Sequence, residues 1–341
     1  MGRSGGRRTS GASTPPVSPR RGPERRSGNE RRADAFTARV AEALGISPSE
    51  AFTRLATRRR TGVRINQLSP LPADEIRERA RALGLGLEPV DWCPDAYLLD
   101  GDKRLLTASD LFADGHLYIQ NLSSLVPALA LGPRPGERIL DLCAAPGGKT
   151  AHIAALTGNQ AELWANDGIA PRLEKLRGVT AQFHVRLARL TGHPAQFADR
   201  LLDATFDRVL LDAQCSGEGL MNPAEPASLR YWSEERITRY GYLQRKMLVS
   251  AFRLLRPGGT LVYSTCTFGP EENEAPVSFL LRHHPVEVVP IDIPPAPDRQ
   301  PGRRSWRGEN FDPGVVGAAR VMPGPVFEGF FVCALRKRSD H

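Results

Sequence analysis

Short apolar runs alternate with longer stretches of helical periodicity from about residue 121 to the end of the chain. The apolar runs have the length of buried parallel strands, and the stretches between them repeat apolar residues every three or four positions. We predict strands at 138–142, 162–166, 207–212 and 259–264, and helices near 148–157, 171–187, 234–255 and 271–283. This alternation predicts a parallel, doubly wound α/β sheet, followed by a last strand at 330–335.

Two of these helices have boundaries marked by particular residues. A Pro-Gly-Gly turn at 257–259 ends the helix predicted over 234–255. A Gly-Pro pair precedes the last helix and places Glu271 and Glu272 in its first turn, where carboxylates interact favourably with the helix dipole.

Residues 35–125 have a different pattern, which predicts a small mixed α/β module. Helical periodicity at 35–44, a capping box at 47–50 and a charged amphipathic stretch at 74–83 predict three helices. Strands are predicted at 61–68, 96–99 and 117–120, and Arg64 falls on the polar face of the first. The arginines of this module could form a nucleic-acid face or lie scattered on solvated helices. They are Arg54, Arg58, Arg59, Arg60 and Arg64.

The net charge of +8 comes mostly from the first 34 of the 341 residues. Residues 1–34 hold nine arginines against three carboxylates, among many Gly, Ser and Pro residues. This composition is typical of a disordered basic tail suited to contacts with phosphate groups, although a solubilising terminus without a partner would look the same.

Composition narrows the class of protein further. With 40% hydrophobic residues the chain can build a large core, yet no apolar run approaches the roughly 20 residues of a membrane span, and no export signal is recognisable. The cysteines lie about fifty or more residues apart, without a metal-binding spacing; they are Cys93, Cys143, Cys215, Cys266 and Cys333. We therefore expect a cytoplasmic, metal-free protein with reduced thiols.

Two of these cysteines follow predicted strands directly. Cys215 lies in Asp212-Ala-Gln-Cys-Ser-Gly-Glu-Gly after one strand, and Cys266 lies in Ser264-Thr-Cys-Thr after another. Because the carboxyl ends of neighbouring parallel strands meet at one crevice, we expect both thiols there. Two thiols in one crevice indicate covalent chemistry on an electrophile, and with a nucleotide-type cofactor loop upstream they favour methylation of a pyrimidine carbon.

The cofactor loop is a strand that runs into small residues and then a helix, over 138–150. It lacks the glycine pattern of dinucleotide folds and that of phosphate-binding loops, which argues against hydride transfer and ATP hydrolysis. Asp167 ends the next strand, twenty residues after Gly147, a spacing that suits hydrogen bonds from a ribose diol. The loop therefore favours a ribose-bearing cofactor.

Four segments in one order carry a resemblance to a known family. They are Asp141-Leu-Cys-Ala-Ala-Pro-Gly-Gly-Lys149, Asn166-Asp167 with Arg172, Asp212–Gly219 and Ser264–Asn273. Shorter matches lie at Arg64–Leu68, Tyr118–Gln120 with Ser123-Ser124, Trp232 with Gln244, and Glu328–Phe331. Over about 60–338 the chain resembles the Nol/Nop/Sun-type RNA cytosine-5 methyltransferases, particularly their bacterial RsmF-like branch.

The resemblance implies a Rossmann-like S-adenosylmethionine-dependent methyltransferase domain at 126–338, and an RNA-binding module at 35–125. It implies that Asp167, with Arg172 beside it, holds the cofactor ribose, that Asp212 lies between cofactor and base, that Cys266 is the nucleophile and that Cys215 assists product release. The loop residues implied to wrap the methionine part of the cofactor are Cys143, Ala144, Ala145, Pro146, Gly147, Gly148 and Lys149. The resemblance implies RNA as the partner, either ribosomal or transfer RNA. We expect the protein to be a monomer.

The chemistry explains why two thiols are useful. Cytosine C5 is a poor nucleophile until a thiolate adds to C6 and makes C5 enamine-like, able to attack a sulfonium methyl group. The C5 proton must then leave and the thiol must be eliminated, where a second thiol can act as base or proton carrier. Asp212 could accept the N4 amino hydrogens or share a proton at N3.

The sequence departs from the family in three places. Gln214 stands where the family has proline, next to Cys215, and no carboxylate follows the third strand, where Leu190–Pro194 is followed only later by Asp199. We also expect no counterpart of the C-terminal RNA-binding domains of longer relatives. These departures leave open a catalytically inactive protein that binds RNA and cofactor during ribosome assembly. A DNA cytosine-5 methyltransferase does not fit, because those enzymes carry their nucleophile at the Cys215 position and lack a second thiol at Cys266.

Overall fold

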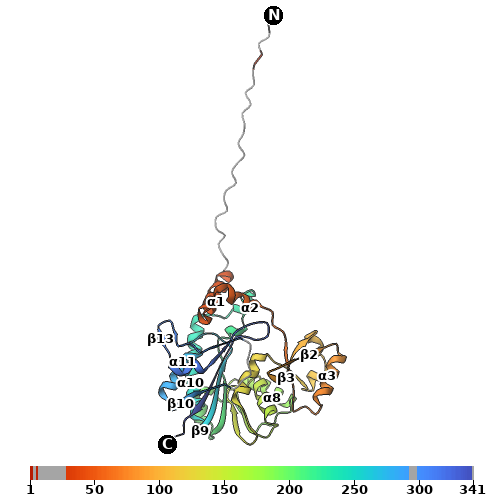
Figure 1. Ribbon diagram of the computed structural model, residues 1–341, viewed down its shortest axis with the longest axis vertical. Coiled ribbons are helices and arrows are strands. Elements are labelled where there is room, and N and C mark those ends of the chain that lie inside the picture. The colour runs from red at the N-terminus through yellow and green to blue at the C-terminus, as the bar shows by residue number, and fades with distance from the viewer. Residues whose placement is uncertain (3–4, 7–27, 292–297, 340–341) are drawn as a thin grey trace.

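The computed structural model describes residues 1–2, 5–6, 28–291 and 298–339, and shows a large twisted sheet with helices on both faces and a smaller lobe beside it (Figure 1). Most of the predicted tail lies outside the described residues. Its last part, 28–34, is the start of helix α1 (Gly28–Leu44), so the assignment of 28–34 to a disordered tail is wrong. Glu30 lies in the first turn of α1, where a carboxylate complements the helix dipole.

The large sheet has the order β11-β14-β15-β9-β8-β5-β6-β7, and β10 also pairs with β15. Strands β5 to β9 are parallel, whereas β15 runs antiparallel to β9. The bounds are β5 (Arg138–Asp141), β6 (Glu162–Asn166), β7 (Arg189–Thr191), β8 (Phe206–Asp212), β9 (Leu255–Thr265), β10 (Val286–Val289), β11 (Arg299–Pro301), β14 (Ala319–Val321) and β15 (Phe330–Lys337). The predicted parallel α/β fold is confirmed.

The helices of this part of the chain follow the strands in the order that the periodicity predicts. They are α6 (Val126–Leu131), α7 (Gly148–Leu156), α8 (Ala170–Gln182), α9 (Ala198–Leu201), α10 (Glu234–Arg253) and α11 (Glu274–His283). A two-stranded ribbon, β12 (Ser305–Trp306) with β13 (Glu309–Asn310), lies between β11 and β14 in the chain.

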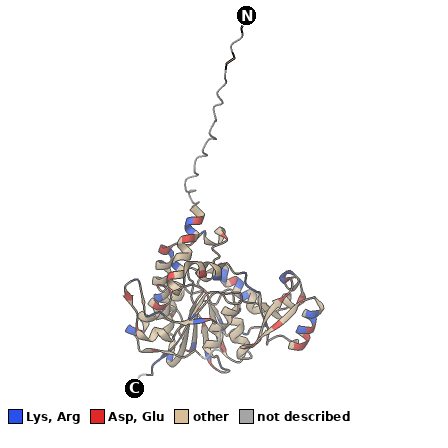
Figure 2. Cartoon of the chain, turned by 45° about the horizontal axis from the view of Figure 1, so that its top comes forward, with Lys and Arg blue, Asp and Glu red and all other residues tan. Residues whose placement is uncertain are grey.

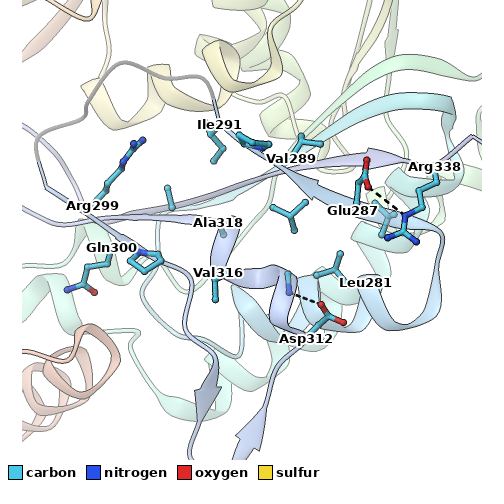
Figure 3. Close-up of a pocket in the computed structure, with 17 residues that line it drawn as sticks. Leu281, Glu287, Val289, Ile291, Arg299, Gln300, Asp312, Val316, Ala318 and Arg338 are labelled. Atoms are coloured by element: carbon cyan, nitrogen blue, oxygen red, sulfur yellow. Dashed lines mark hydrogen bonds and ion pairs between the residues drawn. The ribbon is translucent and has the colours of Figure 1, made fainter.

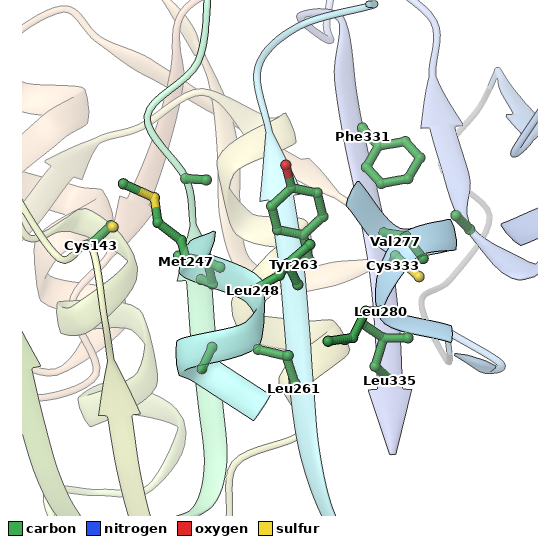
Figure 4. Packing of buried hydrophobic residues seen from close by; sticks show 14 of the residues in the cluster. Cys143, Met247, Leu248, Leu261, Tyr263, Val277, Leu280, Phe331, Cys333 and Leu335 are labelled. Atoms are coloured by element: carbon green, nitrogen blue, oxygen red, sulfur yellow. The ribbon is translucent and has the colours of Figure 1, made fainter. Parts of the chain in front are cut away.

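The two faces of the sheet have separate cores because side chains alternate along each strand. Leu261 and Tyr263 of β9 pack with α10 and α11 in one core, which Figure 4 shows together with Phe331 and Leu335 of β15. Val262, which lies between them in β9, belongs to the opposite core with residues of α6 and α7. Apolar residues on both faces explain why these strands appear in the sequence as continuous apolar runs.

Two predicted boundaries in this region are wrong. The Pro-Gly-Gly turn at 257–259 does not separate α10 from its strand but lies inside β9, where the pairing with β8 shifts register. Such an irregularity accommodates Pro and Gly in a strand. Helix α8 ends at Gln182 instead of near 187, because His184 adopts a left-handed conformation with φ of 58°.

The smaller lobe is an antiparallel sheet of order β2-β3-β1-β4. Its elements are β1 (Gly62–Ile65), α3 (Ala73–Ala82), β2 (Gly86–Val90), β3 (Cys93–Asp100), α4 (Lys103–Thr107), α5 (Asp110–Ala113) and β4 (Leu117–Ile119). Helices α1 and α2 (Pro48–Ala56) pack instead on the large core, through Phe36, Val40 and Leu55. The predicted capping box of α2 is present, since Ser47 Oγ accepts the Glu50 N–H at 3.2 Å.

The prediction of Arg64 on a polar strand face is wrong, because all four residues of β1 are buried and Arg64 has no exposed surface. Its Nε donates to Gln120 Oε1 at 3.3 Å, and burial lowers the pKa of Arg64 to about 10. Arg54 pairs with Glu50 and Asp298, and other basic side chains of the molecule are interspersed with acidic ones (Figure 2). Arg64 therefore cannot belong to an exposed face formed by the other arginines of the module.

Among the described residues, no helix combines the length and the apolar character needed to cross a lipid bilayer.

Candidate active site

The two predicted thiols meet at the carboxyl edge of the sheet. Cys215 follows β8, Cys266 follows β9, and the two Sγ atoms lie 3.2 Å apart. Both side chains are partly buried. The hydrogen bond with Cys266, and then burial, raise the pKa of Cys215 well above its usual value. Cys215 is therefore a protonated thiol at neutral pH, and its sulfur lies within reach of the Cys266 sulfur.

Asp212 and Lys149 form an ion pair next to the thiols. Lys149 Nζ lies 2.7 Å from Asp212 Oδ2, and Ser264 Oγ donates to the other carboxylate oxygen at 2.7 Å. Burial lowers the pKa of Lys149, but the Asp212 carboxylate and the nearby Cys266 outweigh it, so the net shift is upward. Lys149 Nζ also lies 5.7 Å from the centre of the Phe330 ring. Lys149 is therefore a cation at neutral pH, paired with Asp212 and close enough to Cys266 to interact with it electrostatically.

Glu271 and Glu272 do not lie in the first turn of α11, which begins only at Glu274, so the predicted interaction with the helix dipole is wrong. Their carboxylates have tertiary partners instead. Glu271 Oε2 accepts from Arg39 at 2.9 Å, and Glu272 Oε2 accepts the Ser216 backbone N–H at 2.9 Å. The chain turns before α11 because these two carboxylates are bonded to other parts of the molecule.

Glu218 binds the loop that follows Cys266. Its Oε2 accepts the backbone N–H groups of Phe268 at 3.2 Å and Gly269 at 2.9 Å. Trp232 Nε1 donates to Oε1 at 3.1 Å, and Arg39 Nε of α1 lies 3.5 Å from the same oxygen. Sequence reasoning missed Glu218 and Glu272, because their partners lie about fifty residues away along the chain. The family matches at Trp232 and Gln244 could have indicated these glutamates, because Trp232 bonds Glu218 and Gln244 bonds Glu272.

The cofactor loop joins β5 to α7 through backbone geometry. Gly147 has φ of 122°, and a Cβ atom there would lie 2.8 Å from Val179, so only glycine fits. Gly148 begins α7 under the Tyr118 ring of the small lobe, whose hydroxyl would lie 3.1 Å from an added Cβ. Pro146 is exposed, whereas Cys143 is buried in the core, so the cysteine contributes its backbone to the loop (Figure 4).

Asp167 and Arg172 lie beside this loop, as their places in the sequence predict. Asp167 Oδ2 accepts the Ala145 N–H at 3.3 Å and pairs with Arg172 Nη2 at 3.2 Å. Arg172 also donates to the Ala145 carbonyl at 2.7 Å. The side chain of Asn166 donates to the carbonyls of Leu142 and His193, each at 2.9 Å, and so joins the cofactor loop to the segment after β7. Asp167, the residue expected to bind the cofactor ribose, is thus held in position by the loop itself.

Asp141 is a further carboxyl group of the site that the prediction did not include. It ends β5, is 1% exposed, and accepts from Thr150 Oγ1 at 2.7 Å. Burial raises the pKa of Asp141 to about 7. Its Oδ1 has no hydrogen-bond partner among the described residues, which leaves one buried acceptor next to the cofactor loop. Its position at the end of a predicted strand could have identified it from the sequence.

The structure shows the surroundings of Gln214 and of Asp199, the residues at which the sequence departs from the family. The Gln214 carbonyl accepts from Gln244 Nε2 at 2.8 Å, which fixes the turn before Cys215 without proline. Asp199 lies beyond β7 and pairs with Arg253 of α10 at 2.9 Å, so the structure does not bring it to the end of the third strand. The predicted lack of a carboxylate at that strand end therefore stands.

A cavity of about 790 Å³ lies elsewhere, between α11, β10 and β11, and none of the predicted site residues lines it (Figure 3). Its wall is largely apolar, with Arg299 and Arg338 at its ends. In the described part of the chain, no group of three His, Cys, Asp or Glu side chains is placed to hold a metal ion.

Comparison with known proteins identifies the relatives of this arrangement. Residues 128–336 match the family model of the 16S rRNA methyltransferase RsmB/F, and residues 33–122 match the N-terminal domain of 16S rRNA methyltransferase RsmF. The ribosomal RNA small subunit methyltransferase F of Escherichia fergusonii is 36% identical over 317 residues, which cover 89% of this chain and 63% of that protein. The Citrobacter koseri protein of the same name is 37% identical, with the same coverage. The chain thus spans somewhat less than two thirds of these relatives.

Solved structures agree with this relationship. A methyltransferase homolog protein from Pyrococcus horikoshii has a TM-score of 0.72 and 28% identity, and the match covers 88% of this chain and 98% of that one. NSun6 from Pyrococcus horikoshii, solved with SFG, has a TM-score of 0.74 at 23% identity, over 89% of this chain and 98% of that one, and shows the shared fold. The chain belongs to the RsmB/F family of 16S rRNA methyltransferases.

Proposed function

We propose that the protein is an RNA cytosine-C5 methyltransferase that uses S-adenosylmethionine, with small-subunit ribosomal RNA as its substrate. The observation that carries the proposal is the pair of thiols 3.2 Å apart at the carboxyl edge of the sheet, beside Asp212 and Lys149. The names of the relatives support ribosomal RNA over transfer RNA. Such a substrate and reduced thiols favour a cytoplasmic location, and a domain at 126–338 preceded by an RNA-binding module at 35–125.

The residues of the cofactor loop fit S-adenosylmethionine. Gly147 leaves no room for a side chain, Pro146 is exposed, and the N-terminus of α7 supplies free backbone N–H groups. The unpartnered Oδ1 of Asp141 suits the ammonium group of the methionine part, and Asp167 suits the ribose hydroxyls. When bound, this cofactor supplies an electrophilic methyl group. The SFG in the NSun6 structure supports a ligand of this class.

Cys266 is proposed to be the nucleophile. Its thiolate forms a bond to cytosine C6, and C5 then takes the methyl group as the bond between that methyl and its sulfur breaks. In the elimination that follows, Cys215, whose sulfur lies 3.2 Å from the Cys266 sulfur, would give its proton to Cys266 as the Cys266–C6 bond breaks. Cys215 would accept the C5 proton in its place, while the electrons of the C5–H bond restore the double bond between C5 and C6. Two thiols thus divide addition and release.

Asp212 and Lys149 are proposed to prepare the base and the nucleophile. Asp212 is partly exposed, with 27% of its side chain accessible, so its carboxylate can accept the N4 amino hydrogens of a cytosine. Lys149 holds the Asp212 carboxylate in place through an ion pair of 2.7 Å, and its positive charge interacts with Cys266. Neither role requires Gln214 to be proline.

An inactive assembly factor remains the second candidate, because Gln214 and the missing carboxylate depart from the family. The retained pair of thiols favours the enzyme, since a binding protein has no use for two sulfurs in contact at the crevice. Bisulfite sequencing of ribosomal and transfer RNA from a deletion strain would identify the modified cytosine. No lost methylation in either RNA class would support the assembly factor.

Single substitutions of the cysteines test the mechanism. We expect Cys266→Ala to lower methyl transfer by about three orders of magnitude or more, with S-adenosylmethionine binding in calorimetry nearly unchanged. We expect Cys215→Ala to accumulate a covalent protein–RNA adduct, visible as a shifted band on a denaturing gel, because elimination stalls after methylation. If Cys266→Ala remains active and Cys215→Ala does not, the two roles are reversed.

A further inference from the structure

A row of four buried side chains joins the two loops that carry the thiols. Glu272 Oε1 contacts Ser216 Oγ, Ser216 Oγ lies 2.7 Å from Thr267 Oγ1, and Thr267 Oγ1 lies 2.9 Å from Glu218 Oε2. Ser216 directly follows Cys215, and Thr267 directly follows Cys266. All four side chains are at most 4% exposed. We call this row, Glu272–Ser216–Thr267–Glu218, the oxygen chain.

The number of hydrogens in the oxygen chain is one short if both carboxyl groups are ionised. The three successive contacts of the row each need one hydrogen, and Thr267 Oγ1 also lies 3.3 Å from Glu272 Oε1, yet a hydroxyl group donates only one hydrogen. Ser216 and Thr267 therefore supply two. The third hydrogen must belong to one of the two carboxyl groups at the ends. The remaining donors at Glu272, the Ser216 N–H and the Gln244 amide, bind the other oxygen, Oε2.

The surroundings place this proton on Glu272. Glu218 accepts from Trp232 and from two backbone N–H groups, and it faces the Arg39 guanidinium, so these neighbours all act as donors towards it. The groups that face Glu272 are Glu218, Cys215 and the Tyr263 hydroxyl, which donates to the Glu272 backbone carbonyl. None of these is a cation. Burial, together with the neighbouring Glu218, raises the pKa of Glu272 to about 7.

We propose that a protonated Glu272 is a positioning residue for the reaction, which holds Cys215 and Cys266 at their working separation through the oxygen chain. The inference rests on the proposed function for its meaning in catalysis. With Glu272 neutral, its O–H donates to Ser216, Ser216 donates to Thr267, and Thr267 donates to Glu218. Loss of the proton leaves two oxygens without a hydrogen between them, so the two loops separate.

The sign of the pH dependence follows from the raised pKa. Between the ordinary value of 4.5 and about 7, the folded protein holds a proton on Glu272 that the unfolded chain has lost. The contribution of Glu272 to the free energy of unfolding therefore falls as pH rises through that interval. Above a pH of about 7 the oxygen chain has lost the hydrogen that Glu272 supplies. Formation of the Cys266 thiolate favours the opposite trend in rate. Glu272 thus sets an alkaline decline in the rate of methyl transfer.

Glu272→Gln is the decisive variant, because glutamine reproduces the neutral acid. Its carbonyl oxygen can accept from Ser216 and Gln244, and its NH₂ group can donate to Ser216 Oγ at every pH. We expect Glu272→Gln to stay within about threefold of the wild-type rate at pH 6.5 and to lose the alkaline decline. We expect Glu272→Ala to lower the rate about a hundredfold with little change in KM for RNA, since the thiols are misplaced.

Unfolding in urea between pH 5 and 8 provides a second test that needs neither RNA nor activity. Wild type should lose stability as pH rises, and Glu272→Gln should make that slope clearly smaller, leaving the part that comes from Asp141, whose pKa burial also raises to about 7. Glu271→Gln is the matched control, because Glu271 is the next residue but bonds Arg39 and Trp306 instead of the oxygen chain, and we expect it to keep the slope. A Glu272→Gln protein as stable as wild type but as slow as Glu272→Ala would overturn the proposal. An unchanged slope would also overturn it, whatever RNA the enzyme modifies.

Discussion

Lys149 is the residue whose charge connects the cofactor loop with the thiols. It lies 2.7 Å from Asp212 and interacts with Cys266, and both interactions favour its charged form. Lys149 is therefore the cation of the crevice that links the base-contacting carboxylate to the loop residues implied to hold the cofactor. Removal of its charge leaves Asp212 without its ion-pair partner.

We therefore predict that Lys149→Met lowers the rate of methyl transfer by about tenfold, equivalent to about 1.4 kcal/mol of barrier. The measurement is single-turnover methyl transfer at one pH. Lys246→Met is the control, since Lys246 lies on α10 over the Tyr242 ring, and it should leave the rate unchanged. An unchanged rate in Lys149→Met would show that the charge of Lys149 plays no part in the reaction.

At this scale, the sequence predicts the residues that lie at strand ends. Cys215 and Cys266 were found because the carboxyl ends of parallel strands converge, and Asp167 because it ends the strand after the cofactor loop. The role of Asp212 was implied by the family resemblance alone. Glu218 and Glu272 were not found, because hydrogen bonds between two loops leave no periodic pattern in either loop. Asp141 was not predicted as a site residue, because nothing in the sequence distinguishes its carboxylate from the other residues of the motif at 141–149.

Helix α1 is the element that stabilises the site from outside the sheet. Its Arg39 is 3% exposed and lies 3.5 Å from Glu218 and 2.9 Å from Glu271. A buried charge with its partner removed is costly, because the remaining carboxylate has lost both water and cation. Arg39 thus fixes Glu218, and Glu218 fixes the loop after Cys266.

We predict that Arg39→Met lowers the free energy of unfolding by about 3 kcal/mol, as measured by urea denaturation at pH 7. The control is Arg79→Met, which breaks an exposed pair with Glu75 within α3 and should cost less than about 1 kcal/mol. Equal losses in both variants would mean that Arg39 is no more important than a surface arginine.

The elements themselves follow largely from periodicity, and their ends do not. Strands β5, β6, β8, β9 and β15 and helices α7, α8 and α10 appear where the apolar pattern predicts them, whereas the short strands β7, β10, β11 and β14 were not predicted. The start of α11 was misplaced because Glu272 bonds Ser216 rather than the first turn of a helix. The turn at 257–259 was misplaced because a register shift in the pairing of β8 with β9 accommodates Pro and Gly. Tertiary contacts, which a local pattern does not contain, decide both cases.

At the scale of the whole molecule, parts distant in the sequence build one site. In Figure 1, α1 and α2 lie against the part of the fold that contains α11, while the β1–β4 lobe lies beside α8. The lobe contributes Tyr118 over Gly148, so the cofactor loop is covered by a segment that precedes it by thirty residues. The sequence predicts two units but not the contact between them. All four residues of β1 are buried, so this strand has no polar face that would mark the boundary between the lobe and the large sheet.

The distribution of charge leads to the last prediction. Residues 1–27 carry seven arginines and one glutamate, equal to most of the net charge of +8, whereas basic and acidic groups are mixed over the folded part (Figure 2). Arginines that bind phosphates release counterions, and each lost contact reduces the slope of log affinity against log salt by about 0.7–0.9. We predict that removal of residues 1–27 weakens RNA binding at low salt and flattens this slope, while the modified cytosine stays the same. Replacement of the seven arginines by lysine should keep the slope, because the term depends on charge. An unchanged slope after truncation would show that RNA affinity comes from the folded domain alone, and that the tail does not contact phosphates.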